Sequence, residues 1–386
     1  MLFSEARNPK PEAGSRAALR HSDTTFISIS LIRALAIAGI IVENYHTALS
    51  WNDAETLSDL FTLSVATAAG TFVHMFFVLS GYGLTLSLLK KGTVSWTGWA
   101  RERFRKIIVP YWIAVIVVFA AANLSYLWAP AGWDASYSWA TLLAYLTFLR
   151  NFYEPGQELN PAFWFMPAII GLYILFPLLV QVLRRTGMTG LMVFSLLVSN
   201  VAIAVCVHLG YIVDHQNALP LYFVGEFALG MVLAGIAYHR PERFRRLMTL
   251  RYFLLGVTLY ALSGTMARYR LFGYGSSTYN DLFEASGLYL MLLYICRRMS
   301  EAFSPRVLDV LNNVSRSSYM MYLIHWPILA YVLKPLVGTW FSTNMGALPM
   351  LLSSFVFVLL MYILAEGISS LTKKLTPVTV RTLPAR

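Results

Sequence analysis

A few ionisable side chains interrupt stretches of sequence that are otherwise almost purely apolar. They are Arg33, Glu43, His46, His74, Glu226, His325 and Glu366. A charge at membrane depth is costly, so each of these residues is a candidate for a functional role. Glu43 and His46 stand three residues apart, which places them on one face of a helix. A carboxylate beside an imidazole orients the ring and stabilises its protonated form, so this pair predicts a general base.

Arg33 belongs to the same apolar run as Glu43 and His46. In a helix, Arg33 and His46 would be roughly 20 Å apart along the axis, and Asn44 would share the face of Arg33. Arg33 could stabilise negative charge on a substrate or a transition state. Alternatively, its long side chain could extend to the membrane surface.

Three other ionisable residues allow both functional and structural interpretations. His325 precedes Pro327 by two residues, and a proline inside a helix frees a backbone carbonyl and can open a polar pocket. The alternative is a buried histidine that bonds to a neighbouring helix. Glu226 is either an ionisable functional group or a hydrogen-bonding partner between helices, and Glu366 is predicted to be structural.

The segment HMFFVLSGYGL begins with His74 and ends in a group of small residues. Gly81 and Gly83 predict a close approach between two helices. Ser80 has no base near it in sequence, so we do not expect a nucleophilic serine.

The segment RERFRKIIVPYW is the densest basic cluster of the chain. It contains Arg101, Arg103, Arg105 and Lys106. One interpretation is a topology signal that also contacts anionic lipid. The other is a cytoplasmic site for a phosphorylated ligand, because guanidinium groups match the geometry of phosphate oxygens.

The composition is that of an integral membrane protein. Hydrophobic residues make up 57% of the 386 and charged residues only 13%, whereas soluble domains carry roughly a quarter charged residues. The net charge of +11 is explained below by orientation in the bilayer. Membrane lipid is therefore an expected partner and nucleic acid is not. The sequence predicts no metal site and leaves the oligomeric state open.

Apolar runs of about 20 residues, the length that spans a bilayer, occur ten times. The sequence therefore predicts an all-α polytopic fold with about ten transmembrane helices. They lie near residues 28–50, 66–89, 107–128, 162–183, 190–209, 219–238, 252–268, 280–297, 317–336 and 346–371. A shorter apolar segment, 137–149, predicts an interfacial or re-entrant element.

Basic residues gather in alternate connections, and acidic residues, Asp281 among them, gather in the others. By the positive-inside rule, both termini are expected to be cytoplasmic, which requires an even number of spans. The predicted organisation is a tail at 1–26, a membrane domain at 27–372 and a second tail at 373–386. Without a signal-peptide pattern, the first run is expected to be a retained helix, and the expected location is the inner membrane of a cell.

Five segments together resemble the acyltransferase-3 family of membrane acyltransferases. In chain order they are SLIRALAIAGIIVENYH, MFFVLSGYGL, RERFRKIIVPYW, FWFMPAIIGLYILFPLL and SYMMYLIHWPI. The third is similar to the family's arginine-rich loop, the fourth, which contains Trp164, to its Trp-Phe helix, and the fifth to its Tyr-Leu-Ile-His-x-Pro signature. Glu366 is a plausible further match near the end.

The resemblance implies a ten-helix enzyme that transfers an acyl group, usually acetyl, from cytoplasmic acyl-CoA to a sugar hydroxyl. The product would be an O-acylated exopolysaccharide or other surface glycan, and succinyl is an alternative acyl group. By the resemblance, Arg33 matches the arginine of the family's first helix. The resemblance also implies that the loop residues contact the CoA phosphates; these are Arg101, Arg103, Arg105 and Lys106. The family's Arg-x-x-Arg pattern appears as Arg103 followed by Lys106. Trp164, Glu226, Asn44 and His325 are expected to support the substrates.

The chain departs from the family in the first of these segments. The family commonly places ten residues between its arginine and histidine, whereas twelve separate Arg33 from His46. Asn44 stands at the usual histidine position, and an amide is not a general base. We therefore predict His46, assisted by Glu43, as the base that takes the proton of the acceptor hydroxyl.

Other classes of function stay open at this stage. A proton-coupled transporter would use Arg33, Glu43 and His325 along a substrate path. A haem protein would use His46, His74 or His325 as axial ligands. A sensor or scaffold without activity would fit a site that Asn44 has inactivated.

Overall fold

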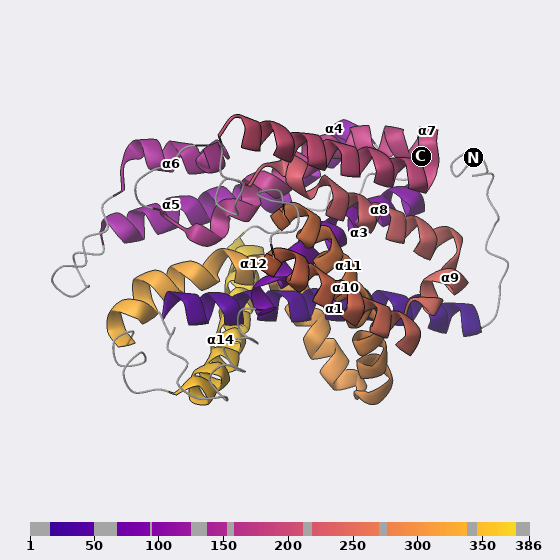
Figure 1. The fold of residues 1–386 in the computed structure, drawn as a ribbon. Helices are drawn as coiled ribbons and strands as arrows, with labels where there is room; N and C mark the ends of the chain where they lie inside the picture. The colour runs from indigo at the N-terminus through magenta and orange to yellow at the C-terminus, as the bar shows by residue number, and fades with distance from the viewer. Residues whose placement is uncertain are drawn as a thin grey trace, which may run out of the picture.

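The computed structural model describes the chain in eight stretches: residues 16–49, 68–92, 95–124, 137–152, 158–210, 218–269, 276–337 and 346–375. Helix is the only regular secondary structure in these stretches (Figure 1). The predicted all-α fold is therefore confirmed. The segments that follow the first, third, fifth, seventh and ninth predicted spans lie partly or wholly outside the described residues.

The longer helices, in chain order, are α1 (Arg16–Ala48), α3 (Phe72–Lys91), α5 (Val109–Asn123), α7 (Phe165–His208), α8 (Val224–His239), α10 (Leu250–Tyr269), α11 (Ser276–Ala302), α12 (Pro305–Ile328) and α14 (Ala347–Leu375). Short helices connect them: α4 (Trp96–Arg103), α6 (Trp139–Leu146) and α9 (Pro241–Arg246). A π-helical turn, Phe104–Ile108, joins α4 to α5, and another, Leu329–Leu333, follows α12. Single 3-10 turns precede α7 and α8.

Seven of the described helical stretches are long and apolar enough to cross a membrane. One of them, Pro161–His208, has 48 residues and contains two of the predicted spans. Its two parts meet at Gly187, where φ is +75°, a value that residues with a side chain rarely adopt. Helices α10 and α11 occupy the predicted spans 252–268 and 280–297. The total of ten crossings stays a prediction.

Helix α1 lies at the centre of the bundle and packs against α3, α11, α12 and α14 (Figure 1). Ile32, Ala36, Ile37 and Ile41 are fully buried, and their four-residue spacings give the helix an apolar face toward its neighbours. The helix begins at Arg16, within the predicted tail. The segment predicted to be interfacial contains α6, whose eight residues are too few to span a bilayer.

Helices α3 and α8 approach so closely that only glycine fits at their contact. A Cβ atom on Gly81 would lie 2.0 Å from the carbonyl oxygen of Phe227, and one on Gly230 would lie 1.9 Å from that of Val78. The predicted packing role of Gly81 is confirmed. Gly83 is exposed, and a Cβ there would meet nothing within 4 Å. The same prediction was therefore wrong for Gly83, which points away from the contact.

Candidate active site

Two cavities open along α1, one beside its middle and one nearer its end. The first, which we call the basic cavity, has a volume of about 540 Å³. Its cationic lining residues are Arg33, Arg103, Lys106 and Arg316. The second, which we call the acidic cavity, has a volume of about 460 Å³. Its ionisable lining residues are Glu43, His74, Asp281 and Glu284.

The two cavities share a wall made by four side chains, Ile40, Val73, Phe165 and Tyr322, each of which lines both. Tyr322 is held in place because its hydroxyl donates to the carbonyl of Ala162 at 2.7 Å. A ligand in the basic cavity and a ligand in the acidic cavity would therefore meet across a single layer of side chains.

The geometry of the basic segment explains which of its cations reach the basic cavity. Arg103 ends α4 and Lys106 lies in the following π-turn, so a spacing of three residues puts both on one face. The Nε of Arg103 is buried and has no hydrogen-bond partner among the described residues. Arg101 and Arg105 are exposed and do not line the cavity. The structure thus brings together Arg33, Arg103 and Lys106 of the predicted donor residues.

In the acidic cavity, carboxylates and indole rings lie side by side. Asn44, Trp164 and Trp326 join the acidic residues in its lining, and no lysine or arginine does so among the described residues. The position of Trp164 is fixed by Asn151, whose side-chain nitrogen donates to the Trp164 carbonyl at 3.0 Å and to the Ala218 carbonyl at 2.8 Å. Flat rings beside hydrogen-bond acceptors suit a polyhydroxylated ligand with apolar ring faces.

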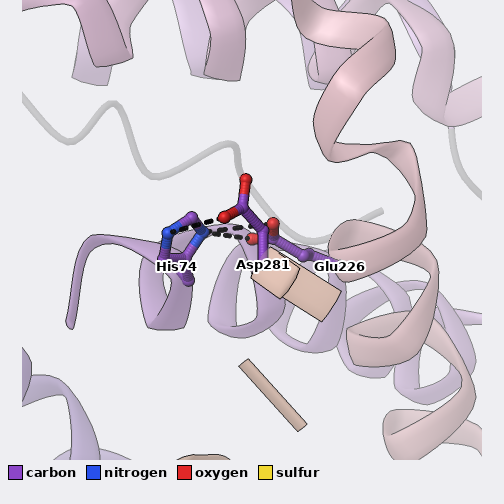
Figure 2. A group of neighbouring side chains, drawn as sticks. All are labelled: His74, Glu226 and Asp281. Carbon is purple, nitrogen blue, oxygen red and sulfur yellow. Dashed lines mark hydrogen bonds and ion pairs between the residues drawn. The ribbon is translucent and has the colours of Figure 1, made fainter. Parts of the chain in front are cut away.

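His74 is bracketed by two carboxylates (Figure 2). Its Nδ1 lies 3.1 Å from Oε1 and 3.2 Å from Oε2 of Glu226, and its Nε2 lies 3.8 Å from Oδ1 of Asp281. All three residues are buried, with His74 3% and Glu226 2% exposed. Each comes from a different helix: His74 from α3, Glu226 from the first turn of α8 and Asp281 from α11. This is a compact cluster of ionisable groups at the edge of the acidic cavity.

Helix geometry explains how these side chains meet. His74, Val78 and Gly81 recur along one face of α3, and Glu226 and Gly230 recur along one face of α8. The glycine contact between these faces sets the distance between the two helices. Glu226 also lies at the N-terminus of α8, where the helix dipole favours a negative charge.

Helix α1 continues through His46 to Ala48 without a break. Asn44 therefore faces the acidic cavity, where its Nδ2 donates to the Ile40 carbonyl at 2.8 Å. His46 is 4% exposed, has its ring 6.2 Å from that of Tyr45, and lines neither cavity. Glu43 accepts a hydrogen bond from Thr47 at 3.1 Å. The structure thus groups Glu43 with Asn44 rather than placing His46 at the cavity.

His325 and Glu366 make contacts outside both cavities. His325 is fully buried, and its Nδ1 donates to the carbonyl of Tyr322 at 2.7 Å. Ser317 donates to Glu366, which ties α12 to α14 and agrees with a structural role. Among the sequence-predicted supporting residues, Asn44 and Trp164 line the acidic cavity, and Glu226 bonds to the His74 ring that lines it.

The family comparison matches residues 26–366 to the acyltransferase-3 model, which describes an acyltransferase domain. The chain belongs to the acyltransferase-3 family. No curated protein and no solved structure matches it. This protein is therefore a membrane acyltransferase that works on an acyl donor and an acceptor within a multi-pass helical bundle.

The acyltransferase could also hold a metal ion, although none was expected from its sequence. One ligand atom each from His74, Glu226 and Asp281 can be chosen so that all lie within 4.8 Å of one another. Imidazole and carboxylate are both ligands for divalent transition metals. In the geometry observed, however, the two ring nitrogens face different carboxylates, as in a hydrogen-bonded relay.

Sequence reasoning missed three residues that line the two cavities. Asp281 and Glu284 lie three residues apart on α11 and line the acidic cavity, whereas Asp281 was predicted to belong to an outer connection. Arg316, one of the basic residues in the connections predicted to be cytoplasmic, lines the basic cavity. Two acids with helical spacing inside a predicted span were the available signal for the first pair.

Proposed function

We propose that this acyltransferase moves an acyl group, acetyl in the simplest case, from acyl-CoA to a sugar hydroxyl of an exported or cell-surface polysaccharide. The observation that carries the proposal is the pair of cavities with opposite charge and a shared wall. Acyl transfer needs a polyanionic donor and a hydroxyl acceptor that meet at one point. The two cavities supply a cationic and an acidic chamber that meet at Tyr322.

The basic cavity is the proposed donor site. CoA carries phosphates, and Arg33, Arg103, Lys106 and Arg316 provide charge-assisted hydrogen bonds to them. The unpartnered Nε of Arg103 is a donor that a phosphate oxygen would satisfy. Arg33 lies seven residues before Ile40, about 10 Å along the axis. Arg33 is therefore better placed to contact the phosphates of the donor than its reacting carbonyl. The flexible arm of CoA would carry that carbonyl to the shared wall.

The acidic cavity is the proposed acceptor site. Trp164 and Trp326 offer apolar faces for a pyranose ring, and Glu43, Asp281 and Glu284 offer acceptors for its hydroxyl groups. By the positive-inside rule the basic cavity faces the cytoplasm, where acyl-CoA is made, and the acidic cavity faces the outside of the inner membrane. The ten-span topology with both termini cytoplasmic belongs to the same proposal.

Inverted membrane vesicles from the encoding strain test the proposal, because they present the cytoplasmic face and carry the natural acceptor. Vesicles receive radiolabelled acetyl-CoA, or succinyl-CoA in a parallel assay, and the label in extracted glycan is counted. Vesicles with the protein should transfer label into glycan, and vesicles from a deletion strain should not. Equal labelling of the two preparations with both donors would refute the proposed activity.

The base that receives the acceptor proton is a separate question. The sequence predicts His46 with Glu43, and that prediction is tested by the same assay with His46→Gln. The donor and acceptor assignments above do not rest on it, because His46 lines neither cavity.

A further inference from the structure

We propose that His74, oriented by Glu226, is the general base of the acyl transfer, and that Asp281 holds the acceptor sugar beside it. The inference rests on the proposed function and names the residue that performs its proton transfer. It assigns a catalytic role to a histidine on α3 that no comparison marks. Three observations support it.

The first observation is location. Val73 belongs to the wall shared by the two cavities, and His74 follows it directly and lines only the acidic cavity. The ring therefore stands on the acceptor side, one residue from the place where the thioester would arrive. A general base must lie within hydrogen-bond reach of the proton that it removes. Of the buried histidines His46, His74 and His325, only His74 lines either of these two cavities among the described residues.

The second observation is the hydrogen bonding of the ring. An ionised carboxylate has only hydrogen-bond acceptors, so in the bond of 3.1 Å to an ionised Glu226 the proton lies on Nδ1. When the ring is neutral, Nε2 on the side of Asp281 is then the unprotonated nitrogen that can take up a proton. Glu226 fixes this tautomer and stabilises the charge that appears when Nε2 takes up a proton.

The third observation is the surroundings of Nε2. Asp281 lies 3.8 Å from it, which is too long for a strong hydrogen bond. Glu284, three residues later on α11, and Glu43 on α1 line the same cavity. Asp281 can accept a hydrogen bond from a second hydroxyl of the sugar, which would orient the reacting hydroxyl toward Nε2.

The proton and the electron pairs balance in this scheme. Nε2 removes the hydroxyl proton as the sugar oxygen bonds to the thioester carbonyl carbon. The tetrahedral intermediate then collapses, the carbon–sulfur bond breaks, and the CoA sulfur leaves with the electron pair. The imidazolium returns its proton to this sulfur, so the products are the sugar ester and CoA thiol, and His74 is neutral again.

The same three side chains could bind a divalent cation, and this is the strongest rival explanation for the cluster. A metal that used Nδ1 would have to displace the bond to Glu226. A metal on Nε2 would occupy the position that the acceptor hydroxyl needs. A metal site predicts that a chelator inactivates the enzyme, whereas a general base predicts that a chelator has no effect on the rate.

The test uses the vesicle assay with His74→Gln, which preserves a hydrogen-bonding side chain of similar length. Labelled glycan should form at least about 100-fold more slowly, in line with the loss of a general base, at an unchanged KM for acetyl-CoA. His208→Gln is the matched control, because His208 is exposed at the end of α7 and lies outside both cavities. Glu226→Gln should lower kcat about tenfold and leave the KM for acetyl-CoA unchanged, as expected of a positioning residue.

A second variant separates catalysis from folding. His74→Gly leaves a space for imidazole, so added imidazole should raise the transfer rate of this variant at least tenfold. The same imidazole should not raise the transfer rate of His74→Gln. Wild-type turnover in His74→Gln, or a loss confined to His46→Gln, would overturn the assignment while the transferase activity itself stands. Inactivation of the wild type by EDTA with recovery on addition of Zn²⁺ would also overturn it, in favour of a metal site. Absence of labelled glycan in the wild type would instead refute the proposed function.

Discussion

Arg33 and Glu43 lie on one uninterrupted stretch of α1 and line different cavities. Glu43 stands ten positions after Arg33, about 15 Å along the axis. Ile40 lies between them and lines both cavities. The helix thereby places a cation at the proposed donor end and a carboxylate at the proposed acceptor end. A single helix thus carries charges of opposite sign on the two sides of the shared wall.

Donor binding should depend on the cations that line the basic cavity. Arg103→Ala removes one charge-assisted contact to phosphate, worth about 1.5–3 kcal/mol, and should raise the KM for acetyl-CoA about tenfold or more. Arg105→Ala should have a smaller effect, because Arg105 is exposed and does not line the cavity. Initial rates in inverted vesicles over a range of acetyl-CoA concentrations measure both.

The control for this series is Arg243→Ala, an exposed cation on α9 outside both cavities. It changes the net charge as much as Arg103→Ala does. An equal rise in KM for the two variants would mean that the donor senses overall surface charge rather than the basic cavity.

Charge in the acidic cavity should exclude anionic acceptors. Glu43, Asp281 and Glu284 line it, and no described lysine or arginine does. Bringing a carboxylate beside three acidic groups is unfavourable, because like charges repel strongly where water is scarce. In vesicles opened with detergent, so that added sugars reach the acidic cavity, methyl glucoside in millimolar excess should therefore compete with the natural acceptor better than methyl glucuronide does. Better competition by the glucuronide would show that the acceptor lies elsewhere.

The wall between the cavities should prevent water from consuming the donor. Tyr322 is 7% exposed and lines both cavities, so Tyr322→Ala should join them. We expect acetyl-CoA hydrolysis to rise severalfold relative to transfer, measured as free CoA against labelled glycan. Tyr322→Phe retains the ring and loses only the bond to Ala162, at about 1 kcal/mol. It should keep hydrolysis low, and a similar leak in both variants would contradict the role of the ring.

The sequence predicted the fold class and the polarity of α1 from strong, local signals. Apolar runs identify membrane helices without reference to their neighbours, because each must satisfy its own backbone hydrogen bonds. Arg33 and Glu43 were identified as candidate site residues because an isolated charge in an apolar run is conspicuous. The resemblance also pointed to Arg103 and Lys106, and both line the basic cavity.

The cluster around His74 could not be predicted, because its members meet only in three dimensions. Glu226 follows His74 by 152 residues, and Asp281 lies farther still along the chain. The sequence favoured His46 because Glu43 is its neighbour in number. The turn of the helix instead places Asn44 at the cavity and leaves His46 buried outside it. Distances between helices are set by packing contacts, which a single sequence does not display.

The last prediction concerns the packing contact that holds His74 beside Glu226. Gly81→Ala would place a methyl group 2.0 Å from the Phe227 carbonyl oxygen, so α3 and α8 must move apart. Overpacking of this kind costs about 1–3 kcal/mol or more, and it would lengthen the bond of 3.1 Å between His74 and Glu226. We expect a lower melting temperature in detergent and a lower kcat. Gly83→Ala, two residues away and exposed, meets nothing within 4 Å and should be as stable as the wild type or more stable by up to about 1 kcal/mol, because alanine favours a helix over glycine. Equal stability of the two variants would mean that α3 and α8 are not in contact at Gly81.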